Sequence, residues 1–106
     1  MDELLLARIK RLILAQKYLF SEKAEIELLR DHITRMDVIE AIINAPKITK
    51  KIKSRSKYKT SKIEYLYIIP GITWDGIPIY TKGTIKHFEG EDVFYLLISS
   101  KRYIGS

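Results

Sequence analysis

Tyr80 and Lys82 are the residues whose types and spacing point most directly to chemistry. They lie in a segment, residues 77–86, in which isoleucines and small residues alternate with polar ones. Residues two apart on a β-strand project to the same side, about 6.6 Å from each other, so both side chains are expected on the polar side. A phenol donates a proton or stacks on a base, and an ammonium group holds a phosphate. The pair therefore predicts contact with nucleic acid.

Further basic residues are expected around this pair. Thr84 and Lys86 continue its alternating set. The residues expected to project together from an earlier strand are Lys51, Lys53 and Arg55, and those expected at the end of the last strand are Lys101 and Arg102. If these strands are neighbours, they form a basic groove that contains tyrosines. The competing interpretation is a solvated strand whose lysines only discourage aggregation.

The charge distribution favours a polyanionic partner. The net charge is +6, but residues 1–46 hold 7 basic and 8 acidic groups, whereas residues 47–106 hold 12 basic and 5 acidic ones. Residues 47–62 alone contain 7 Lys and 1 Arg with no acidic residue. A balanced half joined to a strongly basic half predicts nucleic acid as the first candidate partner and an acidic protein as the second.

Several classes of protein and site are excluded by composition. The chain has 106 residues, enough for one domain, and no cysteine, so disulfide scaffolds and thiolate metal sites are ruled out. His32 and His87 are isolated, and the sequence has no glycine-rich phosphate loop and no nucleophile elbow. We therefore expect no metal and no cofactor. The apolar runs are far below the ~20 residues that span a bilayer, which predicts a cytoplasmic protein without membrane contact.

The pattern of apolar residues predicts an α+β fold. Helices are expected over residues 2–16, over residues 22–31 after the N-cap Ser21, and from Thr34 with Asp37 as its capping partner. Strands are expected over residues 48–55, 63–69, 77–86 and 93–99. In this prediction residues 18–20 form a link, and Pro70-Gly71 ends the second strand. The three helices pack on one face of an antiparallel sheet of about four strands, in a single domain whose helical half is 1–46 and whose sheet half is 47–106.

Short motifs along most of the chain resemble a family of bacterial toxins. Ser21–Ala24, Leu28–Thr34 and Asp37–Ile42 are similar to the helical half of MqsR-like toxins, which belong to the RelE/ParE-like toxin superfamily. The segment Gly76–Lys82 resembles the glycine, hydrophobic, tyrosine and lysine strand of that family. Val93–Ser100 followed by Lys101 resembles its closing strand.

The resemblance implies a RelE-like fold and a toxin of a type II toxin-antitoxin system. Such a toxin is a metal-independent endoribonuclease that cleaves messenger RNA and binds a cognate antitoxin protein. By motif, the implied catalytic residues are Tyr80, Lys82 and Lys101, and the lysine of the family's first strand falls among Lys50, Lys51 and Lys53. The glutamine that the family carries in mid-sheet has no counterpart in residues 63–70. The predicted RNA-binding residues are Lys50, Lys51, Lys53, Arg55, Lys86 and Arg102.

The chemistry and its alternatives can be stated from these residues. Metal-free cleavage uses the ribose 2′-hydroxyl as nucleophile, with Lys82 or Lys101 as the stabilising cation, Arg102 as a phosphate clamp and Tyr80 as acid or stacking ring. A lysine acts as base only where like charges, such as a cluster of Lys51, Lys53 and Lys82, lower its pKa. The alternatives are a non-enzymatic module that binds nucleic acid or protein, and a ParE-like poison of a DNA-handling enzyme.

Overall fold

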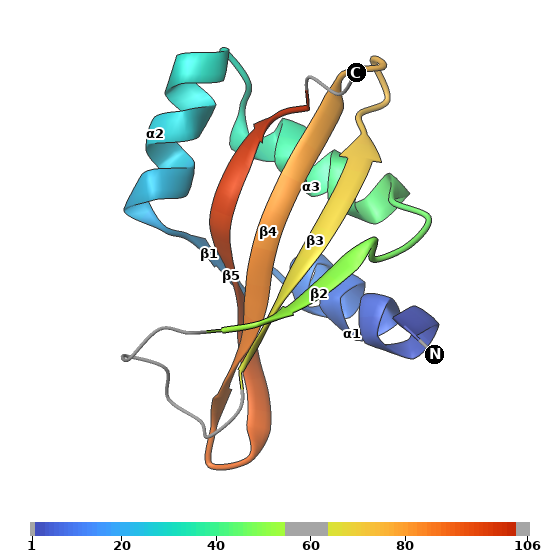
Figure 1. The fold of residues 1–106 in the computed structure, drawn as a ribbon, viewed down its shortest axis with the longest axis vertical. Helices are drawn as coiled ribbons and strands as arrows, with labels where there is room; N and C mark the ends of the chain where they lie inside the picture. The colour runs from blue at the N-terminus through green and yellow to red at the C-terminus, as the bar shows by residue number, and fades with distance from the viewer. Residues whose placement is uncertain (1, 55–63, 104–106) are drawn as a thin grey trace.

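The computed structural model describes residues 2–54 and 64–103 and has the predicted α+β class. Helices dominate the first part of the chain and strands the second (Figure 1). The elements are α1 (Asp2–Leu14), β1 (Tyr18–Phe20), α2 (Glu22–Asp31), α3 (Arg35–Asn44), β2 (Lys50–Lys53), β3 (Tyr65–Ile72), β4 (Pro78–Phe88) and β5 (Glu91–Arg102). The strands form one sheet in the order β1-β5-β4-β3-β2.

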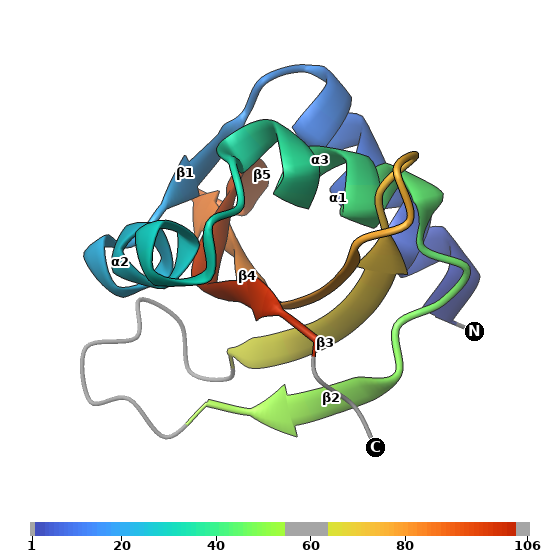
Figure 2. The ribbon, with the colours of Figure 1, turned by 90° about the horizontal axis from the view of Figure 1, so that it is seen from above.

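The helices pack on the sheet in two ways. Helices α1 and α3 cover one face, called the helix face here, whereas α2 lies beside β5 at the edge of the sheet (Figure 2). The core between the helices and the helix face contains the buried residues Ile9, Ile13, Val38, Ile42, Ile69, Ile79, Ile85, Tyr95 and Leu97. The opposite side of the sheet, called the outer face, carries Tyr80 and Lys82, because both alternate along β4 with the buried residues Ile79 and Thr81.

Local capping defines the predicted starts of the second and third helices. The Ser21 hydroxyl accepts a hydrogen bond from the Ala24 N–H at 3.1 Å, and α2 begins at the next residue. Thr34 and Asp37 form the predicted capping box, in which each side chain accepts from the other's backbone N–H. Both side chains satisfy donors that the first turn of a helix leaves unpaired. Helix α1 ends at Leu14, two residues before the predicted end.

Residues 18–20 form a strand, which corrects the prediction of a link. Strand β1 pairs in parallel with β5, with Tyr18 opposite Tyr95 and Phe20 opposite Leu97. The predicted antiparallel sheet of about four strands is therefore a mixed sheet of five, and the 1–46 half supplies one of its strands. Tyr18 and Phe20 are of types that favour strands, but three residues are too few to show an alternation, and pairing with a segment some 75 residues later in the chain defines this strand.

Strand β3 runs through Pro70-Gly71, where the sequence predicted its end. The Thr49 N–H donates to the Ile68 carbonyl at 2.9 Å, so the backbone of Ile68 faces β2, and alternation turns Pro70 the same way. Proline has no N–H to donate to a neighbouring strand. Because the pairing of β2 with β3 stops at Ile68, no residue of β2 is opposite Pro70, and the sheet loses no hydrogen bond there. Gly71 lets α3 approach the strand, since a Cβ there would lie 1.9 Å from the Ala41 carbonyl oxygen.

Two turns complete the sheet. Gly76 follows β3 with φ of 86°, and Glu89 and Gly90 join β4 to β5 with φ of 54° and 85°. These positive values match the predicted turns at Asp75-Gly76 and around Gly90. Among the described residues, no helix is both long and apolar enough to span a membrane.

Candidate active site

Tyr80 and Lys101 face each other across β4 and β5. They are directly opposite in the antiparallel register, and the Lys101 Nζ lies 5.2 Å from the centroid of the Tyr80 ring. Both side chains are half-buried. At this distance the ammonium interacts with the ring face, which holds the two groups together. Two of the three residues predicted to be catalytic therefore form one pair.

Lys82 lies on the same face, one repeat further along β4. It is opposite Ser99 on β5 and opposite Ile68 on β3, and Ile68 in turn is opposite Lys50 on β2. Directly opposed residues share a face, so one row across the sheet contains Lys50, Ile68, Lys82 and Ser99. Tyr80, Lys82 and Lys101 thus share the outer face, with Lys50 two strands from Lys82.

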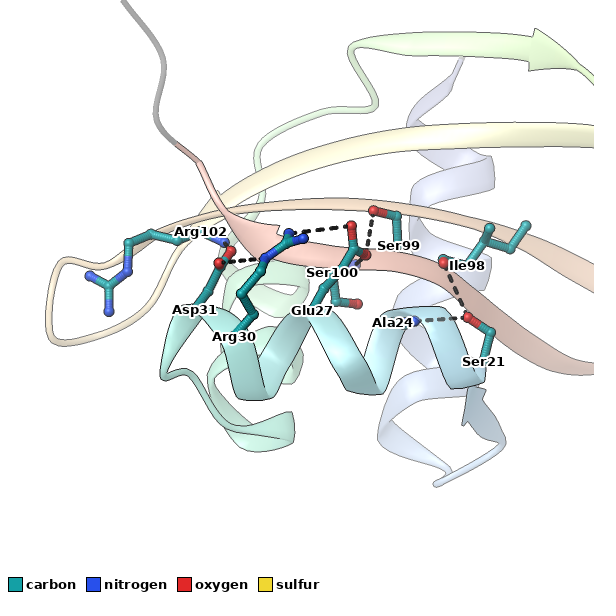
Figure 3. Close-up of polar contacts among 9 residues, drawn as sticks. All are labelled: Ser21, Ala24, Glu27, Arg30, Asp31, Ile98, Ser99, Ser100 and Arg102. Carbon is teal, nitrogen blue, oxygen red and sulfur yellow. Dashed lines mark hydrogen bonds and ion pairs between the residues drawn. The ribbon is translucent and has the colours of Figure 1, made fainter.

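An irregularity in β5 brings Lys101 to this face. Gly83 is opposite Leu97 but Lys82 is opposite Ser99, so Ile98 is an extra residue in β5. Simple alternation from Tyr95 and Leu97, both in the core, would turn Lys101 toward the helices. The Ser21 hydroxyl, which caps α2, donates to the Ile98 carbonyl at 3.1 Å (Figure 3). The start of α2 therefore holds the bulge that aims Lys101 at Tyr80.

Glu27 of α2 is a buried carboxylate beside this site, and the sequence analysis missed it. It is 6% exposed, and its Oε1 accepts from the Ser99 hydroxyl at 2.8 Å and from the Ser100 N–H at 3.1 Å (Figure 3). The Arg30 guanidinium lies 3.9 Å from its Oε2. A signal was present, since Glu27 lies three residues after Ala24 on the buried stripe of the helix.

The environment of Tyr80 favours its protonated form. Burial raises the pKa of Tyr80 above its usual range, and the negative charge of Glu27 raises it further. Both causes act against the phenolate. Tyr80 therefore carries its phenol proton at neutral pH.

Asp31 and Arg102 form a second contact between α2 and β5, made through the backbone of Arg102. The Arg102 N–H donates to the Asp31 Oδ2 at 2.9 Å, and this bond is the main cause that lowers the pKa of Asp31. Residues four apart on a helix are about 6 Å apart along its axis, close to the distance between residues two apart on a strand. The spacing of Glu27 and Asp31 on α2 therefore fits the spacing of their partners Ser100 and Arg102 on β5. The Arg102 side chain points away from Glu27 and Ser99 (Figure 3), because its register opposite Ile79 turns it from the outer face.

Lys51 and Lys53 do not join the site, contrary to prediction. Strand β2 pairs with β3 and not with β4, and Lys51 is opposite Tyr67, a core residue of the helix face. The Lys51 Nζ instead lies 4.4 Å from the centroid of the Tyr65 ring. A one-residue shift in register exchanges the faces of a strand, so Lys50 takes the place expected for Lys51. The predicted cluster of Lys51, Lys53 and Lys82 does not form.

The two remaining predicted RNA-binding residues have different outcomes. Lys86 is engaged in the protein, because its Nζ lies 3.0 Å from the Glu64 carboxylate and both side chains are largely buried. Its charge is already compensated, which argues against a role in holding phosphate. Arg55 lies outside the described residues.

Among residues 2–54 and 64–103, no group of three or more His, Asp or Glu side chains is arranged to hold a metal ion. Comparison of the chain with models of protein families, with curated proteins and with solved structures found no significant match. The function is therefore inferred from the residues of the outer face.

Proposed function

We propose that this chain is a metal-independent endoribonuclease that cleaves messenger RNA, a toxin restrained by a cognate antitoxin protein. The observation that carries the proposal is the pair of Tyr80 and Lys101, with Lys82 beside it on one face of the sheet. A proton donor next to two cations is what phosphodiester cleavage needs around its leaving oxygen and its crowded phosphate. The resemblance to MqsR-like toxins supplies the class of substrate and partner.

The reaction proceeds within the RNA strand. The ribose 2′-oxygen bonds to the adjacent phosphorus, the bond from phosphorus to the 5′-oxygen breaks, and the products are a 2′,3′-cyclic phosphate and a 5′-hydroxyl. Tyr80 gives its proton to the departing 5′-oxygen, while Lys101 and Lys82 stabilise the negative charge of the phosphate. The 2′-hydroxyl proton passes to solvent hydroxide, because the Glu27 carboxylate is only 6% exposed and is bonded to Ser99 and Ser100 of β5.

End mapping of cleaved RNA in the presence of EDTA tests this proposal. We expect 5′-hydroxyl and cyclic phosphate ends from the purified protein, and a rate at least a hundredfold lower for Tyr80→Phe, since general acid catalysis contributes about 10²–10⁴-fold. Tyr18→Phe is the matched control, because Tyr18 is also a half-buried strand tyrosine but lies in β1. Intact RNA at high protein concentration would refute the proposal, as would equal rates for the two variants.

A non-enzymatic RNA-binding module is the second candidate, favoured by one observation. Glu27, the carboxylate beside Tyr80, is buried and hydrogen-bonded, so the site offers no free carboxylate there to take the 2′-hydroxyl proton. Such a module would bind RNA with an affinity that falls steeply as salt rises and would leave the strand uncut. The same end-mapping experiment separates the two functions.

A further inference from the structure

A pocket of about 350 Å³ opens beside the candidate active site and has no role in the mechanism above. It lies where the end of α3, the start of the segment leading to β2, the β3–β4 ends and Tyr103 meet. Its walls are mostly apolar and include Pro46, Pro70, Ile72, Pro78 and Tyr103. Ile72 and Tyr103 are 55% and 45% exposed, so apolar surface stands open to solvent there. Apolar pockets with a few polar groups are the usual binding sites of small molecules.

The pocket is continuous with the outer face that carries Tyr80. Pro70 is directly opposite Tyr80, and Pro78 precedes Tyr80 by two residues on β4 with Ile72 opposite it. Residues two apart on a strand share a face and are about 6.6 Å apart. The pocket therefore begins one repeat along the strand from the predicted proton donor.

The polar groups at the rim are suited to a nucleotide. The Asn44 Nδ2 donates to the Ile72 carbonyl at 2.9 Å, which fixes the amide at the edge of the pocket. Lys47 is exposed on the same rim. The Tyr103 N–H donates to the Pro78 carbonyl at 2.8 Å and thereby anchors the backbone that carries the half-exposed ring. An amide, a cation and an aromatic ring can meet the edge, the phosphate and the face of a nucleotide, respectively.

We propose that this pocket binds the nucleobase of a nucleotide next to the scissile phosphate of single-stranded RNA, a proposal that rests on the function above. The base stacks on Tyr103 against the proline wall, and Lys47 contacts its phosphate. The pocket thereby determines which nucleotide flanks the cut. A protein side chain is the rival occupant, but the position of the pocket beside Tyr80 and the cation at its rim favour RNA.

Binding of a non-cleavable RNA tests the pocket separately from catalysis. The probe is a fluorescent single-stranded oligonucleotide with 2′-O-methyl riboses, together with versions that carry one abasic residue at successive positions. We expect one abasic position to weaken binding about tenfold, the usual size of one base–aromatic stack. Tyr103→Ala should weaken binding of the intact RNA equally and show no further loss with that abasic RNA. Trp74→Ala is the matched control, since Trp74 is 72% exposed and lies outside the pocket.

The outcomes distinguish this inference from the proposed function. Equal affinity for every abasic RNA, or separate and additive losses in Tyr103→Ala, would overturn the pocket even if RNA is cleaved. Persistent base dependence in a protein that leaves natural RNA intact would support the pocket and refute the nuclease. If an acidic peptide bound at Tyr103 and the RNA did not bind, the pocket would be assigned to a protein partner and the inference would be overturned.

Discussion

Replacing Glu27 by alanine should destabilise the protein far more than an exposed glutamate does. The Glu27 Oε1 accepts two hydrogen bonds from β5, one from the Ser99 hydroxyl and one from the Ser100 N–H, and both serine residues are at most 2% exposed. Alanine would leave both donors buried without a partner, at a cost of about 1–3 kcal/mol each. The expected loss is about 3–5 kcal/mol, a large part of the stability of a domain of this size.

Glutamine at position 27 separates the hydrogen bonds from the charge. Its amide oxygen can accept the same two bonds, so we expect Glu27→Gln to lose only about 1 kcal/mol, the difference between a charged and a neutral acceptor. Glu25→Ala is the matched control, because Glu25 lies on the same helix with its side chain 41% exposed and pairs with Arg35 at the surface. Exposed pairs contribute about 0–1 kcal/mol.

Urea unfolding at pH 7 and 25 °C, followed by circular dichroism, measures all three variants. The predicted order of stability loss is Glu27→Ala, then Glu27→Gln, then Glu25→Ala, with unchanged m-values. An equal loss for Glu27→Ala and Glu25→Ala would refute the claim that α2 covers the edge of β5 through this carboxylate.

Three further predictions follow from other contacts. Gly71→Ala should lower the free energy of unfolding by about 3 kcal/mol or more in thermal or urea unfolding, because the new Cβ would overlap the Ala41 carbonyl oxygen. Gly76→Ala meets no atom within 4 Å and is strained only by its φ of 86°, so a loss for Gly71→Ala no larger than that of Gly76→Ala would contradict this. Tyr80 has a raised pKa and keeps its proton up to about pH 10, so the cleavage rate should rise with pH up to that value. A fall in the cleavage rate between pH 8 and 9, measured against Tyr80→Phe as background, would show that Tyr80 is not the acid. The pKa of Asp31 is lowered in the folded protein, so its carboxylate stabilises the fold fully above about pH 4 and loses this contribution as pH falls through the folded-state pKa. In urea unfolding, the free energy of unfolding should therefore differ less between pH 7 and pH 3 for Asp31→Asn than for the parent chain. Equal differences would be the contrary result.

Local chemistry explains the parts of the fold that the sequence predicts well. Ser21, Thr34 and Asp37 each act on backbone groups within three residues, so the starts of α2 and α3 can be located without knowledge of the rest of the chain. The alternation of Ile79 and Thr81 with Tyr80 and Lys82 likewise identifies the two sides of β4.

Pairing between distant segments explains what the sequence did not predict. Strand β1 exists because it pairs with β5, and Lys50 rather than Lys51 shares the outer face because of its register with Ile68. The extra residue Ile98 reverses the alternation of β5, and no residue type in the segment signals it.

Glu27 shows how a candidate site residue can be missed. A glutamate in an amphipathic helix is usually solvated, so its type gave no reason to place it in the core. Its burial depends on two donors of β5, more than 70 residues later in the chain. The contacts between α2 and β5 are therefore visible only in the folded protein.

The most direct test of the central claim compares cations on the two faces of the sheet. The double variants Lys82→Ala/Lys101→Ala and Lys51→Ala/Lys53→Ala remove the same charge, but the first pair lies beside Tyr80 and the second is directed to the helix face. The measurement is the rate of RNA cleavage at low salt for each double variant and the parent chain. We predict that the cleavage rate falls at least a hundredfold in Lys82→Ala/Lys101→Ala, because electrostatic stabilisation of the transition state is removed. In Lys51→Ala/Lys53→Ala the rate should fall less than about fivefold, because only a distant charge is removed. Equal losses would contradict the account, because net charge alone would then explain the activity.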